Sequence, residues 1–274
     1  MLEGGVHARH APLQPEDRAR QRKILASRGG RRVSSAARAR SRTLCLPPST
    51  RKMLSSLAFG FVLSTAVTAG MQLSFFLVAW FLQVDKVTDL AGCSNFVVLA
   101  VTTLLVRAPP YTTRQLVLTA LVCVSRLELG AFLLYRVVTR GKDARFDEIR
   151  SSCGAFGAFW AFQFLWVLGV SAPIIYVNSV GGVDEPPLGA LDYAAWAVFG
   201  ASFALQVVAD VQKHRFRANP ANAGRVCSVG VWAWSRHPNF AGEVLLWWAA
   251  FAGGCPVFAE SPGGYATVCS PLLT

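Results

Sequence analysis

Long apolar runs, separated by short polar segments, dominate the chain after about residue 53. A helix that crosses the hydrocarbon core of a bilayer needs about 20 mostly apolar residues. Six runs meet or approach this length and predict membrane-spanning helices at residues 54–83, 95–106, 115–138, 155–177, 188–209 and 244–258. Residues 263–274 resemble the first part of another apolar segment. The pattern therefore predicts an all-α polytopic membrane helix bundle, with six transmembrane helices plus the start of a seventh and a truncated C-terminus.

The composition supports a membrane protein. Hydrophobic residues make up 53% of the 274 residues, and the mean hydropathy is +0.40, which is too apolar for an ordinary soluble domain. The net charge of +12 raises nucleic-acid binding as an alternative, but residues 1–52 hold 13 of the 27 Lys and Arg and only 3 of the 15 acids. The rest of the chain is nearly neutral, so no basic groove for nucleic acid is expected.

Residues 1–52 differ in kind from the rest of the chain. They are rich in Arg, Ser and Ala, poor in acids, and contain no apolar run. Such a composition builds no core and is typical of a disordered tail or of an organelle transit peptide. A natural start at Met53 is a further alternative. Two regions are therefore expected: a basic tail at residues 1–52 and a transmembrane domain at residues 53–274.

The loops between the expected helices differ in charge. The loop at residues 139–150 and the segment at residues 213–236 are rich in Lys and Arg, whereas residues 178–192 contain no base. One crossing per apolar run places both basic loops on one side and the acidic segment on the other. Because Lys and Arg mark cytoplasmic loops, that side is expected to be cytoplasmic. The basic tail would then start on the opposite side, so we expect it to be removed or not native.

Polar residues inside a membrane span are costly and therefore informative. Arg126 and Glu128 lie two positions apart in the third span, so they point to nearly opposite faces of a helix, and each needs its own partner from a neighbouring helix or a wet cavity. Hydrogen bonds between helices explain Gln72 and Gln163. The seven Cys residues are scattered without a Cys-x-x-Cys pair, so neither a disulfide framework nor a metal site is expected from them.

Donors, acceptors and cations gather between Asp210 and Glu243, together with His214 and His237, the two His residues outside the tail. Pro238 directly after His237 argues against a zinc-binding helix, nothing places the two His residues on facing helices for a haem, and no Gly-x-Gly-x-x-Gly or Walker loop is present. Arg and Lys can still hold phosphate groups. The segment therefore reads either as a phosphate-binding site or as a basic loop that contacts anionic lipid headgroups.

The segments "ADVQKHRF" and "ANAGRVCSVGVWAWSRHPNFAGEVLLWW" resemble the hallmark region of the steroid 5-alpha-reductase-like membrane proteins, in particular their DUF1295 subgroup. Upstream, "DKVTDLAGCSNFVVLAV", "SRLELGAFLLYRVVTRGKDARFDEIR" and "FWAFQFLWVLGVSAPIIYVNS" resemble the same subgroup in the same order, so the resemblance covers about residues 54–274. The short motif Arg-His-Pro-x-[Tyr/Phe]-x-Gly also occurs in isoprenylcysteine carboxyl methyltransferases and phospholipid methyltransferases. Glu243 directly after Gly242, and Asp210 with its basic run, favour the reductases.

The resemblance implies a membrane-embedded reductase that uses NADPH and takes a lipid or steroid-like substrate from the bilayer. Family enzymes add a hydride to the β carbon of a C=C bond conjugated to a carbonyl group, and then a proton to the α carbon. Glu243 is implied as the catalytic residue that hydrogen-bonds the substrate carbonyl, either protonated or supported by a second donor. The implied cofactor-binding residues are Asp210, Arg217, Arg236, His237 and Asn239. No metal is implied.

The sequence departs from the family pattern at two positions. Gln206 stands where the subgroup usually has Glu, and Glu128 stands where a small or apolar residue is usual. Trp247 and Trp248 are expected to form membrane wall and an interfacial anchor. A methyltransferase that uses S-adenosylmethionine and a non-catalytic membrane protein are the alternative functions. The family implies the endoplasmic reticulum, and the Arg-rich tail leaves a plastid or mitochondrial membrane as alternatives.

Overall fold

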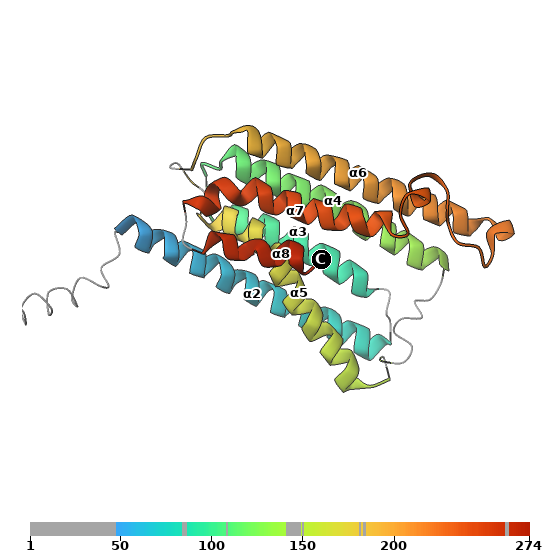
Figure 1. Ribbon diagram of the computed structural model, residues 1–274. Helices are drawn as coiled ribbons and strands as arrows, with labels where there is room; N and C mark the ends of the chain where they lie inside the picture. The colour runs from blue at the N-terminus through green and yellow to red at the C-terminus, as the bar shows by residue number, and fades with distance from the viewer. Residues whose placement is uncertain are drawn as a thin grey trace, which may run out of the picture. The chain divides into compact units, whose positions relative to one another are not determined.

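The structure, a computed structural model, describes residues 48–83, 87–107, 109–140, 149, 151–180, 182, 185–260 and 263–274. The chain divides into two compact units, Met1–Arg51 and Lys52–Thr274. Most of the first unit, including residues 1–47 of the expected basic tail, lies outside the described residues. The second unit consists of helices and loops (Figure 1), and the described ranges contain no strand.

Six helices of the described chain are long and apolar enough to cross a membrane. They are α2 (Pro48–Leu82), α3 (Val87–Val106), α4 (Thr113–Arg140), α5 (Cys153–Val180), α6 (Ala190–Ala218) and α7 (Pro238–Ala259). The short elements η5 (Gly264–Val268) and α8 (Cys269–Leu272) follow α7. The predicted all-α polytopic bundle is confirmed.

Two helices are longer than the apolar runs that predict them. α3 begins at Val87 rather than near Asn95, because polar residues of its first half, Asn95 included, are buried against other helices. α6 continues beyond Ala209 through a polar stretch and ends at the Asn219–Pro220 pair, where the residue before Pro favours extended backbone. Hydropathy thus locates the apolar part of each helix, whereas turn residues determine where the helix ends.

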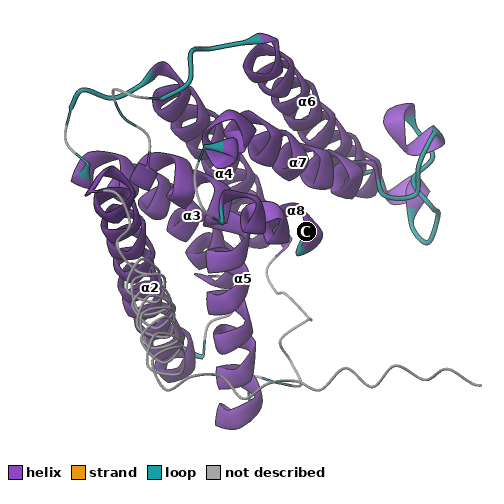
Figure 2. Ribbon diagram, turned by 60° about the vertical axis from the view of Figure 1, so that its left-hand side comes forward, coloured by secondary structure: helices purple, strands orange, loops and turns teal. Residues whose placement is uncertain are grey.

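α2 and α6 lie at opposite edges of the bundle, with α3, α4 and α7 between them (Figures 1 and 2). α6 packs most extensively against α7, and α3 packs against both α4 and α5. The main hydrophobic core combines side chains of α3 to α7, among them Phe96, Val122, Ile175, Phe199 and Trp247. Many large apolar side chains also lie on the outer surface, as expected where helices face lipid.

Contacts between helices define two ends of the bundle. At one end, Arg114 at the start of α4 contacts Asp192 at the start of α6. At the other end, Asp210 near the end of α6 contacts Asn239 at the start of α7. The ends of α4 and α6, which lead into the two basic loops, therefore lie on the same side, as one crossing per apolar run predicts. We refer to this side as the basic end and to the opposite side as the acidic end.

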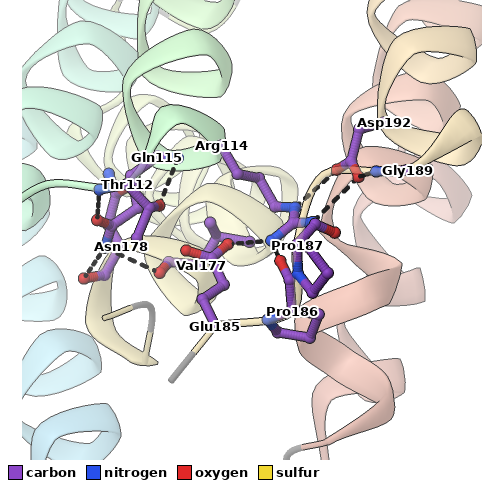
Figure 3. A network of polar contacts seen from close by, with 10 residues as sticks. All are labelled: Thr112, Arg114, Gln115, Val177, Asn178, Glu185, Pro186, Pro187, Gly189 and Asp192. Atoms are coloured by element: carbon purple, nitrogen blue, oxygen red, sulfur yellow. Dashed lines mark hydrogen bonds and ion pairs between the residues drawn. The ribbon is translucent and has the colours of Figure 1, made fainter. Parts of the chain in front are cut away.

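Arg114 is held at the acidic end by two carboxylates (Figure 3). Its Nε donates to Asp192 Oδ1 over 2.6 Å and its Nη2 to Asp192 Oδ2 over 3.0 Å, while Nη1 donates to Glu185 and to the Pro186 carbonyl. The Arg114 and Asp192 side chains are each 1% exposed. Asp192 also accepts the Gly189 N–H over 2.9 Å. The network ties the segment before α6 to the start of α4.

A row of small and polar side chains joins α2 to the bundle. Its members recur every four residues and so share one helix face: Gly60, Ser64, Thr68 and Gln72. Gln72 Nε2 donates to Asn95 Oδ1 of α3 over 3.1 Å, and Asn95 Nδ2 donates to Thr68 Oγ1 over 3.4 Å. Gln163 Nε2 of α5 donates to the Thr88 carbonyl of α3 over 3.2 Å. The interhelical hydrogen bonds predicted for Gln72 and Gln163 are confirmed.

Candidate functional site

α6 and α7 bring two of the predicted site residues together at the basic end. Asp210 lies near the end of α6 and Asn239 in the first turn of α7, and Asn239 Nδ2 donates to Asp210 Oδ1 over 2.9 Å. α7 begins at this level because Pro238 occupies its first position, where the missing backbone N–H costs no helical hydrogen bond.

A cavity of about 470 Å³ lies beside this pair, between α4, α6 and α7. We refer to it as the polar cavity. Its lining residues are Phe132, Arg136, Asp210, Lys213, His214, Arg217 and Asn239. Three of these side chains are cations and one is an acid. Guanidinium groups present paired donors to phosphate oxygens, so this lining suits a ligand that carries phosphate groups.

His214 lies in the wall of the polar cavity, although the family resemblance assigns it no role. Its ring packs against Phe132 and Tyr135 of α4, with ring centroids 6.1 and 5.4 Å away. The His214 Nδ1 atom is buried and has no hydrogen-bond partner among the described residues. A bound ligand with a suitable polar atom would satisfy it. Its position between Asp210 and Arg217 in the sequence is the feature from which a place in this cavity could have been predicted.

Arg236 and His237 are not brought together with the other predicted site residues. Both side chains are exposed, and neither lines the polar cavity or the second cavity described below. His237 is the residue before α7, and its backbone N–H donates to Ser235 Oγ over 3.1 Å. Cofactor binding by Arg236 and His237 stays a prediction that this geometry does not support.

A second cavity, of about 410 Å³, lies further from the basic end, between α3, α4, α5, α6 and α7. We refer to it as the apolar cavity. Its apolar lining includes Phe96, Leu129, Leu133, Phe159, Phe162 and Trp166. Arg136, Asp210 and Asn239 line both cavities, so the two cavities share a wall.

Arg126 and Glu243 form an ion pair in the wall of the apolar cavity. Arg126 Nη1 donates to Glu243 Oε1 over 2.6 Å, and Nη2 donates to Oε2 over 2.9 Å, so the pair is bidentate. The Arg126 side chain is 1% exposed and the Glu243 side chain 16%. The prediction that Arg126 needs a partner from a neighbouring helix or a wet cavity is confirmed in its first alternative, and that partner is the predicted catalytic residue.

Glu243 accepts two further hydrogen bonds. Gln206 Nε2 donates to its Oε2 and Trp247 Nε1 to its Oε1, both over 2.8 Å. The carboxylate therefore has four donors around it, an arrangement that favours its charged form. Gln206 occupies the position where the sequence departs from the family pattern, and its amide supplies one of these donors.

Trp247 is part of the site rather than of the outer wall, which corrects the expectation from the sequence. It is 0% exposed, whereas Trp248 is 41% exposed. Its indole ring lies 5.4 Å from the Arg126 guanidinium, and the Phe96 ring lies 6.0 Å from the same group. Trp247 follows Glu243 by four positions and so shares its helix face, whereas Trp248 points elsewhere.

Glu128 lies half-buried on α4, and the partner predicted for it is not found among the described residues. It lines neither the polar nor the apolar cavity. Nothing in the described structure explains an acid at this position.

Gly242 allows α7 to approach α6 closely beside the site. A Cβ atom at this position would lie 2.8 Å from the Ser202 carbonyl oxygen and 3.0 Å from the Gln206 backbone nitrogen. Both are backbone atoms of α6 and cannot turn away. The Gly that follows Arg-His-Pro in the motif therefore has a packing reason, which is to bring Glu243 within reach of Gln206.

We expect Gly242→Ala to separate α6 from α7 and to lower the free energy of unfolding by about 1–3 kcal/mol, as overpacking does in tight interfaces. Thermal unfolding of the purified protein in detergent measures this loss. Gly200→Ala is the matched control, because Gly200 lies on α6 with nothing within 4 Å of an added Cβ. A loss of stability as large in Gly200→Ala would contradict the packing argument.

Comparison with known proteins identifies the family but not an activity. A protein called "Uncharacterized protein C594.04c", from Schizosaccharomyces pombe (strain 972 / ATCC 24843), is 30% identical over 111 residues, which cover 34% of this chain and 32% of that protein. The match thus spans about a third of the length of this curated relative. No solved structure matches. The family model described as "Protein of unknown function (DUF1295)" matches residues 75–274, more than half of the chain. The chain therefore belongs to the DUF1295 family.

Proposed function

We propose that this protein is a membrane-embedded reductase that uses NADPH to reduce a C=C bond conjugated to a carbonyl group in a lipid. The observation that carries the proposal is the shared wall between the polar cavity and the apolar cavity. A reaction between a charged, water-soluble cofactor and a lipid requires two such environments side by side. The resemblance to steroid 5-alpha-reductase-like proteins supports the class of reaction.

The polar cavity fits the cofactor end of such a site. Arg136, Lys213 and Arg217 are cations that can bind the phosphate groups of NADPH. The Asp210–Asn239 pair lies where the two cavities meet and offers an acceptor and a donor for hydroxyl or amide groups. The reduced nicotinamide of NADPH supplies a hydride when it is bound. Asp210 and Asn239 would orient it towards the apolar cavity.

The apolar cavity fits a lipid substrate. Phe162 and Phe240 line it, and they are also 68% and 58% exposed on the outside of the bundle. The cavity therefore reaches the surface that faces lipid. A lipid can enter there directly from the bilayer, with its polar carbonyl group leading towards Arg126 and Glu243.

Arg126 is the group best placed to bind the substrate carbonyl. Its hydrogen bonds to Glu243 and Ser125 use three of its five N–H donors, and its guanidinium lines the apolar cavity. Negative charge develops on the carbonyl oxygen as the β carbon is reduced, and a fixed cation in a dry site stabilises that charge. Glu243 holds the guanidinium in place. A carboxylate has no proton to donate, so Arg126 would supply the donor in the second alternative given for Glu243, support by a second donor.

Binding of NADPH to the purified protein in lipid nanodiscs tests the proposal. We expect Arg217→Ala to weaken binding roughly 10- to 100-fold, because it removes a hydrogen bond between charged groups. Arg215→Ala is the matched control, since Arg215 is an exposed Arg of the same helix that lines neither cavity. Isothermal titration calorimetry measures both affinities.

A different result of the same titration would overturn the proposal. If the protein binds S-adenosylmethionine and not NADPH, methyl transfer becomes the better account. If neither molecule binds to the folded protein, a non-catalytic role is favoured. Equal losses of NADPH affinity in Arg217→Ala and Arg215→Ala would place the cofactor outside the polar cavity.

A further inference from the structure

The segment between α6 and α7, residues 219–237, carries charged and apolar side chains that neither cavity uses. The segment holds two bases, Arg225 and Arg236, and the chain has no acid from residue 211 to residue 242. Two 3₁₀ turns shape the segment, η3 (Pro220–Asn222) and η4 (Gly230–Ala233). In both views it extends from the end of α6 at the basic end of the bundle (Figures 1 and 2).

The segment is fixed against α6 by a small core of its own. Cys227 and Trp232 pack with Ala209, and Trp232 Nε1 donates to the Ala209 carbonyl over 2.8 Å. The Val231 backbone N–H donates to Gln212 Oε1 over 3.0 Å. Because these inward contacts determine which side chains face α6, they also determine which side chains face outward.

The exposed side chains of the segment are large apolar ones and basic ones. Trp234 is 87% exposed and Val226 is 83% exposed, while Trp232 of the same segment is buried. Arg225 and Arg236 are exposed as well. A Trp ring has an apolar body and a polar N–H, and Trp is enriched where proteins meet the membrane–water interface.

The position of the segment along α6 places this side at the membrane surface. Asp192 and Asp210 are 18 positions apart on α6, which corresponds to about 27 Å of helix and nearly matches the ~30 Å hydrocarbon core. Asp192 belongs to the charged network of the acidic end, and Asp210 belongs to the polar cavity. The two therefore mark the two edges of the core. The segment contacts α6 at Ala209 and Gln212, level with the basic-end edge.

We propose that the face formed by Arg225, Val226, Trp234 and Arg236 is a docking surface for anionic phospholipid headgroups. The guanidinium groups bind headgroup phosphate and carboxylate groups, and the apolar side chains insert at headgroup level. The segment has no acid that would repel such a surface. None of the four residues lines either cavity, so this surface is separate from the proposed reductase site.

Fluorescence quenching in nanodiscs tests whether Trp234 lies at headgroup level. We expect Trp234→Phe to remove part of the Trp emission that a headgroup-attached nitroxide quenches, and to leave quenching by a mid-chain nitroxide unchanged. Trp248→Phe is the control. Because Trp248 lies exposed in the middle of α7, we expect this variant to lower quenching by the mid-chain nitroxide and to leave quenching by the headgroup nitroxide unchanged. Unchanged headgroup quenching in Trp234→Phe would overturn the proposal and would indicate water or another protein at this face.

Lipid selectivity tests whether Arg225 and Arg236 bind anionic headgroups. We expect Arg225→Gln/Arg236→Gln to lower the preference for spin-labelled phosphatidylserine over phosphatidylcholine about 25-fold, since each interfacial Arg contributes about five-fold. Lys52→Gln/Arg107→Gln removes the same charge from exposed side chains at the acidic end and should retain the preference. If both double variants lost the same preference, net charge alone would explain the effect and the proposal would fail. If the protein formed a dimer that Trp234→Phe dissociates, the face would bind a second copy of the protein rather than lipid. NADPH affinity should stay unchanged in Trp234→Phe, whose residue has no predicted part in cofactor binding.

Discussion

Replacing Arg126 with Gln is expected to lower the free energy of unfolding by about 3–5 kcal/mol, because it leaves a charged carboxylate without its partner inside the protein. The Glu243 side chain is 16% exposed and lies among the helices of the bundle, so water reaches it only from the cavity and replaces the lost guanidinium only in part. The neutral donors Gln206 and Trp247 remain, but neither carries a compensating charge. Thermal and chemical unfolding of the purified protein in detergent measures the loss.

The double variant Arg126→Gln/Glu243→Gln distinguishes the cost of an unpaired buried charge from the cost of the changed side-chain packing. It removes both charges, so we expect it to regain part of the stability that the single variant loses. A double variant with the summed losses of the two single variants would show that the ion pair contributes no coupling. Reductase activity of the double variant shows whether the two residues take part in the reaction. If the folded double variant retained full activity, Arg126 and Glu243 would have only a structural role.

Replacing Arg114 with Gln is expected to cost a similar amount, about 3–5 kcal/mol, at the opposite end of the bundle. Arg114 is 1% exposed and contacts two carboxylates, Asp192 and Glu185, which would both remain buried without a cation. Because the network lies at the acidic end, NADPH affinity of the folded fraction should not change. Unfolding in detergent and cofactor titration measure the two quantities.

Arg107→Gln is the matched control for the Arg114 prediction. Arg107 lies at the same end of the bundle, but its side chain is exposed and donates to Ser56 Oγ at 3.4 Å. Exposed contacts of this kind contribute about 0–1 kcal/mol. If Arg107→Gln destabilised the protein as much as Arg114→Gln, burial of the carboxylates would not explain the effect.

The helices could be predicted from the sequence because each apolar run meets or approaches the length that a crossing needs. The boundaries could not be predicted as well. The first turns of α3 carry Thr88 and Asp89, which read as a loop until neighbouring helices are in place to bury or pair them. The end of α6 depends on Pro220, eleven residues after the apolar run. Burial between helices is a tertiary property, and hydropathy of a single segment does not contain it.

The candidate site was predicted in part. The resemblance identifies Asp210 and Asn239, which the fold brings together. Arg126 is recognisable in the sequence only as a charge that requires a partner, because Glu243 lies 117 positions away on another helix. The place of Trp247 in the site could have been predicted from its spacing, because it follows Glu243 by four positions and so lies on the same helix face.

Neighbours in the sequence can also separate in the fold. Arg236 and His237 share the motif with Asn239, but they lie before the start of α7 and their side chains face outward. Of the residues in this motif and the Glu that follows it, only those inside the first turns of α7 line the cavities. A motif read as one unit therefore divides, in this structure, into a part that lines the cavities and a part that lies on the surface.

The most direct test of the proposed reductase activity is transfer of deuterium from NADPH labelled at C4 of the nicotinamide ring. The labelled cofactor would be incubated with protein in nanodiscs and a panel of lipids that carry a C=C bond conjugated to a carbonyl group, and the products analysed by mass spectrometry. We predict one deuterium at the β carbon of a reduced product with the wild type and with Arg215→Ala, and none with Arg126→Gln/Glu243→Gln. No deuterated product and no oxidised NADPH with the folded wild type, or a methylated product when S-adenosylmethionine is added in place of NADPH, would contradict the proposal.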